Sequence, residues 1–185
     1  MAMTPSTMLP LGTKAPEFNL LDTLSGKNFS LSELKSDKAT VIMFICNHCP
    51  FVKYVNEQLV QLANDYIPQG VSFIAISSND VDNHPDDSPE NMKIAGLRLG
   101  YPFPYLYDET QEVAKAYDAA CTPDFYIFDG SSKLAYRGQL DDARPSLDIP
   151  VTGKDIRAAL DNLVKWKPVD ENQKPSIGCN IKWKA

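Results

Sequence analysis

Positive charge is scarce and scattered in this sequence. Of its 185 residues, 18 are lysine or arginine and 24 are acidic, which gives a formal net charge of -6. Nucleic acids and anionic membrane surfaces select proteins with clustered basic residues, and no such cluster occurs here. The sequence therefore predicts neither a nucleic-acid partner nor a membrane partner.

Long apolar runs are also missing. No run approaches the roughly 20 residues that a membrane-spanning helix needs. The first ten residues lack the basic residue and following apolar core of a secretory signal. We therefore expect a cytoplasmic protein. Its size and composition predict a single domain over residues 1–185, with a core at about 12–166 and a tail, 167–185, packed on that core.

Cysteine and histidine are few: there are four cysteines, Cys46, Cys49, Cys121 and Cys179, and two histidines. Four scattered cysteines are too few for a disulfide scaffold in a chain of this size. One C-x-x-C pair with two histidines supplies no evident second half of a metal site. We expect no metal and no cofactor, and we interpret the cysteines as chemical or incidental.

The most informative motif is Cys46-Asn47-His48-Cys49, which follows an apolar, strand-like run. A helix predicted from Asn47 would place unpaired backbone N–H groups and partial positive charge beside Cys46, which favours the thiolate, the nucleophilic form. Cys49 could then attack the mixed disulfide and release the partner. We predict that Cys46 attacks and Cys49 resolves. A positive His48 would further stabilise thiolates and make the disulfide more oxidising.

Strand and helix patterns alternate through the middle of the chain, which predicts an α/β protein with a mixed central sheet flanked by helices. Ala39–Ile45 is apolar without alternation, as expected for an interior strand. The other expected strands are 17–21, 28–30, 71–76, 103–107, 124–128 and 134–137. A short helix is expected from Ser32, and longer helices are expected over 47–66, 88–99, 109–119 and 152–166. A capping box at Thr152 opens the last of these helices. The alternating apolar residues of the tail predict an ordered extended segment.

The C-x-x-C motif at a strand–helix junction, together with Thr122-Pro123 entering a later strand, resembles the thioredoxin superfold over residues 12–166. The resemblance implies that Pro123 is cis and faces the dithiol, and that Thr122 binds an incoming peptide through the backbone beside Pro123. The opening 15–20 with Gly26-Lys27 resembles the peroxiredoxin-related branch, which includes alkyl hydroperoxide reductase-like (AhpC/TSA-related) proteins. It implies a thioredoxin-like fold with an N-terminal hairpin extension and an inserted βα element.

Peroxide chemistry is the first alternative function. In peroxiredoxins the peroxidatic cysteine occupies the place of Cys49, and a conserved Thr and Pro precede it; here those positions are Cys46 and Ile42. Dithiol exchange with a disulfide-bearing protein or a small disulfide, recycled by an unidentified thiol donor, therefore fits better than a standard peroxiredoxin mechanism. An atypical antioxidant thiol peroxidase and a non-catalytic redox-sensing or binding module remain open.

The remaining candidates carry alternatives of their own. Cys121 is either a third redox thiol or a small apolar plug, and Cys179 is either a resolving or regulatory thiol or an idle tail residue. Phe51 is our candidate for an apolar surface on which a partner docks. Thr40 stands where thioredoxin carries a buried acid, so the Cys49 proton would pass to Glu57 or to water. The acidic loop 80–87 is interpreted as solvated.

Overall fold

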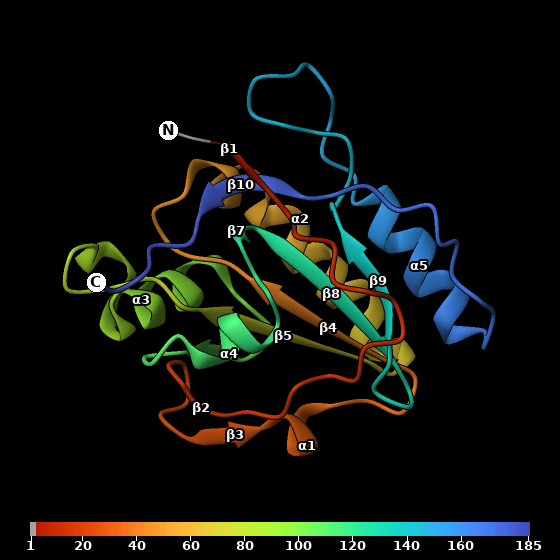
Figure 1. The fold of residues 1–185 in the computed structure, drawn as a ribbon, viewed down its shortest axis with the longest axis horizontal. Coiled ribbons are helices and arrows are strands. Elements are labelled where there is room, and N and C mark those ends of the chain that lie inside the picture. Colours follow the sequence, from red (N-terminus) through yellow and green to blue (C-terminus); the bar gives the residue numbers. More distant parts are fainter. Residues whose placement is uncertain (1–2) are drawn as a thin grey trace.

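The computed structural model describes residues 3–185 and is built around a seven-stranded sheet (Figure 1). The strand order is β3-β2-β6-β5-β4-β8-β9, with β4 parallel to β5, β5 parallel to β6, and the other neighbours antiparallel. The strands are β2 (Asn19–Asp22), β3 (Asn28–Ser30), β4 (Ala39–Phe44), β5 (Val71–Ser77), β6 (Tyr105–Tyr107), β8 (Asp124–Asp129) and β9 (Leu134–Gly138). The mixed sheet confirms the predicted fold class.

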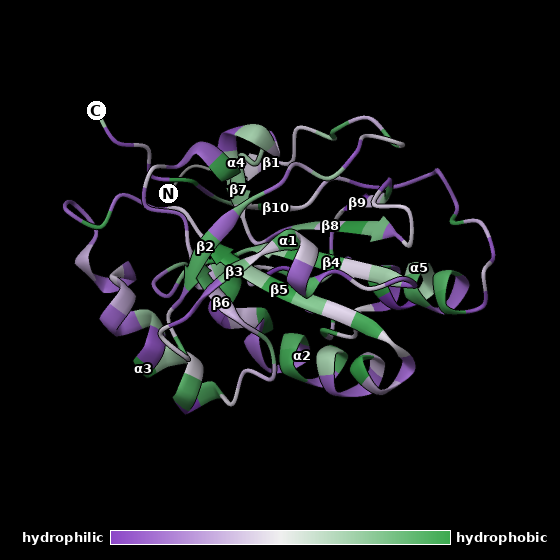
Figure 2. Ribbon diagram, turned by 90° about the horizontal axis from the view of Figure 1, so that it is seen from below, coloured by the Kyte–Doolittle hydropathy of each residue, from purple (hydrophilic) through white to green (hydrophobic). Residues whose placement is uncertain are grey.

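Helices cover both faces of this sheet (Figure 2). The helices α2 (Pro50–Tyr66), α3 (Pro89–Leu99) and α5 (Lys154–Val164) contribute to the core on one face, and α1 (Leu31–Leu34) and α4 (Glu112–Ala116) contribute to the core on the other. The short 3-10 turn η1 (Ile67–Gln69) follows α2, and a second one, η2 (Pro85–Asp87), directly precedes α3. None of the described helices is long and apolar enough to cross a membrane.

Strand β4 is the centre of the molecule. All six of its residues are buried, because Val41 and Met43 point into the core beneath α2 while Ile42 and Phe44 point into the opposite core. Removing apolar side chains from water on both faces is the main stabilising term for such a strand. The prediction of an interior strand is confirmed, and the chain leaves the carboxyl end of β4 directly into the C-x-x-C motif.

A second, three-stranded sheet joins the two ends of the chain. Its order is β1 (Met3–Pro5), β10 (Ile177–Asn180) and β7 (Cys121–Thr122), and both pairs are antiparallel. These strands lie together at the top of Figure 1. The prediction of an ordered extended segment in the tail is confirmed by β10, whose third residue, Cys179, is opposite Thr122.

Two predicted helix starts differ from the structure. Helix α2 begins at Pro50 rather than Asn47, and Cys49 is its N-cap in an extended conformation, because a residue that precedes proline is disfavoured in the helical region. Helix α5 begins after Gly153, so Thr152 forms no capping box. A capping box does occur at Ser30 and Glu33, which open α1. The expectation drawn from the first ten residues falls partly on residues 1–2, which lie outside the described residues.

Candidate active site

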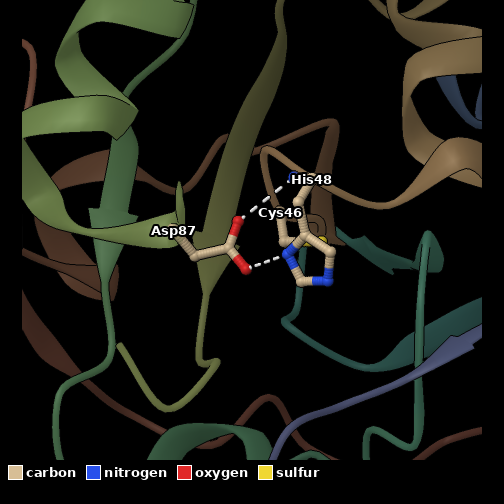
Figure 3. A group of neighbouring side chains, drawn as sticks. All are labelled: Cys46, His48 and Asp87. Atoms are coloured by element: carbon tan, nitrogen blue, oxygen red, sulfur yellow. Dashed lines mark hydrogen bonds and ion pairs between the residues drawn. The ribbon is translucent and has the colours of Figure 1, made fainter. Parts of the chain in front are cut away.

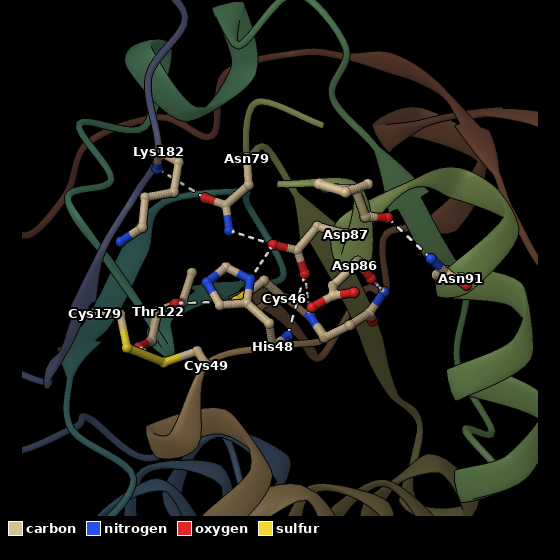
Figure 4. Close-up of polar contacts among 12 residues, drawn as sticks. Cys46, His48, Cys49, Asn79, Asp86, Asp87, Asn91, Thr122, Cys179 and Lys182 are labelled. Atoms are coloured by element: carbon tan, nitrogen blue, oxygen red, sulfur yellow. Dashed lines mark hydrogen bonds and ion pairs between the residues drawn. A yellow bond between two sulfur atoms is a disulfide. The ribbon is translucent and has the colours of Figure 1, made fainter. Parts of the chain in front are cut away.

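The C-x-x-C segment begins just after the carboxyl end of β4 and lies beside Thr122, which precedes Pro123 (Figure 4). The Thr122–Pro123 peptide bond is cis, which confirms that prediction. The Cys46 Sγ lies 3.5 Å from the Thr122 hydroxyl oxygen, and the Cys49 Sγ lies 3.4 Å from the Thr122 carbonyl oxygen. Both cysteines are buried, with Cys46 2% exposed and Cys49 0% exposed. The fold therefore brings Cys46, Cys49, Thr122 and Pro123 together.

The disulfide of the structure joins Cys49 to Cys179, 130 positions later in the sequence, with 6.3 Å between their Cα atoms. Cys46 and Cys121 are free thiols. The disulfide present in this structure is thus not the pairing within the C-x-x-C motif, because β10 carries Cys179 to the edge of β7 beside Cys49. Of the two interpretations of Cys179, the one that brings it back to the site agrees with its position in the structure.

A buried carboxylate that the sequence did not single out holds the C-x-x-C loop. Asp87 pairs with the Nδ1 of His48 (Figure 3), accepts the backbone N–H of Asn47 at 2.7 Å and of His48 at 3.2 Å, and accepts Asn79 Nδ2 at 2.9 Å. Burial raises the pKa of Asp87, but the hydrogen bonds from His48 and Asn79 outweigh burial and hold the pKa below its ordinary value. Asp87 is therefore a fixed negative charge beside the thiol.

In this state, with the Cys49–Cys179 disulfide formed, Cys46 favours the neutral thiol over the thiolate. Burial, and then the charge of Asp87, raise its pKa to about 11, and hydrogen bonds from Thr122 and the backbone offset them only in part. The expectation of a stabilised thiolate at Cys46 is wrong for this state. Helix α2 begins too late to place its first turn at Cys46, and any positive charge on His48 is paired with Asp87.

Removing the Asp87 charge is expected to activate Cys46. In an Asp87→Asn variant the pKa of Cys46 falls, because a thiolate no longer forms beside a carboxylate. Alkylation of Cys46 by iodoacetamide at pH 8, with the Cys49–Cys179 disulfide intact, should be faster by about three- to tenfold, since only the thiolate reacts. The exposed neighbour Asp86 gives the matched control, because Asp86→Asn removes the same charge at the surface. Equal rates in wild type and Asp87→Asn would contradict the electrostatic account.

Cys46, His48 and Asp87 also present thiol, imidazole and carboxylate atoms that lie within 4.8 Å of one another. These donor types could hold a transition metal. In the structure, however, the His48 Nδ1 and an Asp87 oxygen satisfy each other. The expectation of no metal stays a prediction, which elemental analysis of the purified protein tests.

A groove of about 950 Å³ between α2 and α3 leads to the buried thiol. Cys46, Asn47 and Tyr101 are among its lining residues, and Lys53 and Arg98 bring positive charge. Glu57, the candidate proton acceptor for Cys49, also lines this groove. The groove therefore places a space large enough for a small molecule beside Cys46, which is itself 2% exposed.

Cys121 and Phe51 are placed less favourably for chemistry. The Cys121 Sγ is buried and lies 3.7 Å from the Pro123 carbonyl oxygen, and burial, with a smaller effect of Asp124, raises its pKa. That environment favours the plug over a third redox thiol. Phe51 is half-buried and lies beside Pro123 around a small cavity of about 20 Å³. Its role in docking stays a prediction.

Asp124, the residue after Pro123, should make stability depend on pH. Burial raises its pKa to about 7, although Ser6 and Tyr126 donate to its oxygens. The folded protein thus binds this proton more tightly than the unfolded chain, whose Asp pKa is about 3.9. The stabilisation of the fold by this bound proton is complete below about pH 4 and is lost as the pH rises to 7. Over that range the free energy of unfolding should fall by on the order of 4 kcal/mol.

Urea unfolding of wild type and Asp124→Asn between pH 4 and pH 8 measures that effect. The neutral amide cannot ionise, so the free energy of unfolding of wild type should fall relative to that of the variant as the pH rises. Asp148→Asn, at an exposed position, is the control. A difference between wild type and Asp124→Asn that stays constant over this pH range would overturn the assignment.

Asp87 and Asn79 are the site residues that sequence reasoning missed. Both lie in the polar segment after β5, which is adjacent to β4 and parallel to it, so the two carboxyl ends open at one edge of the sheet. The position of Asp87 directly before the Ser88-Pro89 helix start was the available signal. The loop composition instead suggested a solvated surface, whereas Asn79, Asp80 and Asp87 are all buried.

The fold and the cysteine site define a class: thioredoxin-like proteins with a C-x-x-C motif facing a cis-proline. The family follows from the sequence, because residues 11–137 match the AhpC/TSA family. The chain belongs to this family.

Two solved structures resemble the whole chain. One is an uncharacterized conserved protein from Geobacillus kaustophilus, 67% identical, covering 100% of this chain and 97% of that one at a TM-score of 0.98. The other is a hypothetical protein from Sinorhizobium meliloti 1021, 48% identical, covering 98% and 99% at a TM-score of 0.96. No curated protein matches the chain.

A more distant structure supports the fold alone. It is a thiol:disulfide interchange protein of the thioredoxin family from Chlorobium tepidum TLS, 21% identical, covering 83% of this chain and 97% of that one at a TM-score of 0.64. Family and fold together indicate a protein of the thiol-disulfide oxidoreductase or peroxidase type.

Proposed function

We propose that the protein is a thiol-disulfide oxidoreductase that exchanges its cysteines with an external disulfide. The observation that carries the proposal is the position of Cys46. It is a free thiol at the carboxyl end of β4, within 3.5 Å of Thr122 and beside a cis-proline, and it lines the groove between α2 and α3.

The exchange begins at Cys46. Its thiolate attacks one sulfur of the substrate disulfide and forms a mixed disulfide, which releases the other half as a thiolate. In the reduced protein Cys49 then attacks Cys46 Sγ, which releases the second half. The positions of the two sulfurs beside Thr122 support this sequence. An external thiol donor returns the protein to the reduced form.

The groove favours a small substrate with anionic groups. Lys53 and Arg98 line it together with a single acidic residue, Glu57, and its remaining polar lining is largely amide side chains. Complementary charge steers a charged ligand toward such a groove. A low-molecular-weight disulfide with carboxylates therefore fits this route better than a folded protein.

Parallel oxidation of the fully reduced protein by a small carboxylated disulfide, DTNB, and by hydrogen peroxide tests the proposal. We expect fast release of the thionitrobenzoate anion and a slow reaction with peroxide. Cys121→Ser is the control, because it removes a buried thiol that lies outside the Cys49–Cys179 disulfide. A slow reaction with DTNB under conditions in which peroxide reacts fast would reject exchange as the function.

A second candidate is an atypical thiol peroxidase. The specific observation in its favour is that Cys49, which occupies the peroxidatic position by resemblance, is joined to Cys179. A peroxide would oxidise the Cys49 thiolate to a sulfenic acid, and Cys179 would close the disulfide with loss of water. Fast peroxide consumption that is lost in Cys49→Ser but kept in Cys46→Ser would establish this activity.

A non-catalytic binding or sensing module is the third candidate, and its sign is a dithiol too buried to react. The burial of Cys46 and Cys49 points in this direction, whereas the groove that reaches Cys46 points against it. If neither the disulfide nor the peroxide reacts fast with the reduced protein, this candidate replaces the enzyme.

A further inference from the structure

We propose that β10 is an internal substrate strand and that its Cys179 is a third redox thiol, which takes over the disulfide from the C-x-x-C motif. This inference rests on the proposed function. It names a resolving residue for the exchange and accounts for the disulfide that the structure contains. The observation behind it is that β10 pairs with β7 directly before Pro123, while its Cys179 is bonded to Cys49.

The backbone beside the cis-proline is already paired. Strand β10 runs antiparallel to β7, with Cys179 opposite Thr122 and Asn180 opposite Cys121. An extended peptide that added to this edge would form the same backbone ladder. Gly178 permits the close approach, because a Cβ built at this residue would lie 1.9 Å from the Thr122 carbonyl oxygen. The tail strand therefore occupies the peptide position next to Pro123.

The strand is also joined covalently to the site. Its Cys179 lies opposite Thr122 and is bonded to Cys49 (Figure 4). In the proposed exchange an external substrate is bonded to Cys46 instead, so β10 resembles a bound substrate in its backbone pairing and not in the cysteine to which it is bonded.

Contacts on either side of β10 fix it in this place. The Ser176 hydroxyl donates to the Pro123 carbonyl oxygen at 2.5 Å, before the strand. After the strand, the Lys182 backbone N–H donates to Asn79 Oδ1 at 2.9 Å, and the Asn79 amide donates to Asp87 (Figure 4). The tail is thus connected to the C-x-x-C loop through the disulfide and through the residues that hold Asp87.

The chemistry is an intramolecular exchange that conserves electrons. When Cys46 and Cys49 have been oxidised by the substrate, the Cys179 thiolate attacks Cys49 Sγ. A Cys49–Cys179 bond forms, the Cys46–Cys49 bond breaks, and Cys46 leaves as a thiolate that takes up a proton. Over the whole cycle Cys49 and Cys179 supply two electrons and two protons to the substrate disulfide. Cys46 returns as a thiol.

The raised pKa of Cys46 slows the reversal of this exchange, and it also makes Cys46 a slow leaving group in the forward step. A thiol whose pKa is raised to about 11 is a poor attacking group at neutral pH, so it does not readily reopen the Cys49–Cys179 bond. With β10 bonded in place, the β7 edge is closed to peptides, while the groove to Cys46 is lined by other residues and stays open. The oxidised protein therefore excludes extended peptide partners from this edge.

Disulfide mapping after a single turnover tests the inference. Fully reduced protein is mixed with one equivalent of DTNB, quenched with acid, alkylated and mapped by mass spectrometry. We expect the Cys49–Cys179 disulfide with alkylated Cys46, in at least about tenfold excess over Cys46–Cys49. A product dominated by Cys46–Cys49, with alkylated Cys179, would overturn the internal relay but leave the proposed exchange intact. No release of thionitrobenzoate would instead reject the proposed function.

Three variants sharpen the experiment. Cys179→Ser should stop at Cys46–Cys49. Gly178→Ala keeps every thiol but pushes β10 from Thr122, so the Cys46–Cys49 fraction should rise by at least about threefold, because Cys179 is delivered less often to Cys49. Cys121→Ser should map as wild type. Circular dichroism confirms that each variant is folded, and a Gly178→Ala protein that is folded yet maps as wild type would contradict the role of the strand.

Discussion

Replacing Cys46 by serine is expected to reduce the rate of exchange between the reduced protein and a small disulfide by at least about a thousandfold, because the attacking thiolate is lost and a hydroxyl at neutral pH does not replace it. Cys46 is the cysteine that lines the groove, whereas neither Cys49 nor Cys179 does. The measurement is a stopped-flow trace of thionitrobenzoate release under excess DTNB.

The same variant separates the two chemistries considered for the site. In the exchange mechanism Cys46→Ser removes the first step, although Cys49 and Cys179 can still be joined by slow, non-specific oxidation. If Cys49 were the primary nucleophile, Cys46→Ser would retain most of the rate and Cys49→Ser would lose it. Retention of more than about a tenth of the wild-type rate in Cys46→Ser would show that Cys46 does not make the first attack.

Reducing the Cys49–Cys179 disulfide is expected to lower the free energy of unfolding by about 4 to 5 kcal/mol. The bond spans 130 positions, and closing so long a loop restricts the unfolded chain strongly. The disulfide also fastens the three-stranded sheet of β1, β10 and β7 to helix α2, whose N-cap is Cys49. A loss of this size is a large fraction of the stability of an ordinary domain.

Urea unfolding of the oxidised and the reduced protein, each kept in its redox state, measures this difference. The Cys49→Ser, Cys179→Ser double variant should match reduced wild type and should not respond to reductant, whereas Cys121→Ser should retain the full response. By linkage, a disulfide that stabilises the fold is stabilised by the fold against reduction to the same extent. Identical unfolding midpoints for oxidised and reduced wild type would show that the bond contributes nothing to stability.

Local patterns predicted the parts of the fold that local physics determines. The uninterrupted apolar run of β4 required burial on both faces, and the Ser88-Pro89 start and the Gly100 end of α3 follow from capping and from the left-handed conformation of Gly100. Thr122-Pro123 was assigned as cis because of its resemblance to the thioredoxin superfold, and the structure confirms it. The apolar spacing predicts a start for α2 at Asn47, earlier than the structure has it, because Pro50 disfavours the helical conformation at Cys49.

Only part of the candidate site could be predicted from the sequence. Cys46 and Cys49 could be found from their C-x-x-C spacing, which is typical of dithiol chemistry. The partner of Cys49 could not, because Cys179 reaches it through the pairing of β10 with β7, a contact between segments far apart in the sequence. Asp87 was hidden for a similar reason, since a carboxylate becomes a buried charge only through partners such as His48 and Asn79.

The raised pKa of Cys46 follows from those same hidden contacts. A motif at a helix start suggests an acidic thiol, but the thiol in this fold is buried beside a carboxylate. Its environment is expected to change when Cys49 is released from Cys179, because the disulfide and the Asn79 contact connect the tail to the C-x-x-C loop. The reactivity of Cys46 should therefore be measured in both redox states.

Trapping the mixed disulfide is the most direct test of the central claim that Cys46 attacks an external disulfide. A Cys49→Ser, Cys179→Ser double variant lacks both resolving thiols, so attack on DTNB should leave thionitrobenzoate bonded to Cys46. Peptide mapping should find that adduct at Cys46 in nearly every molecule, with Cys121 unmodified. A protein that releases no thionitrobenzoate, or that carries the adduct at Cys121 instead of Cys46, would contradict the assignment of Cys46 as the nucleophile.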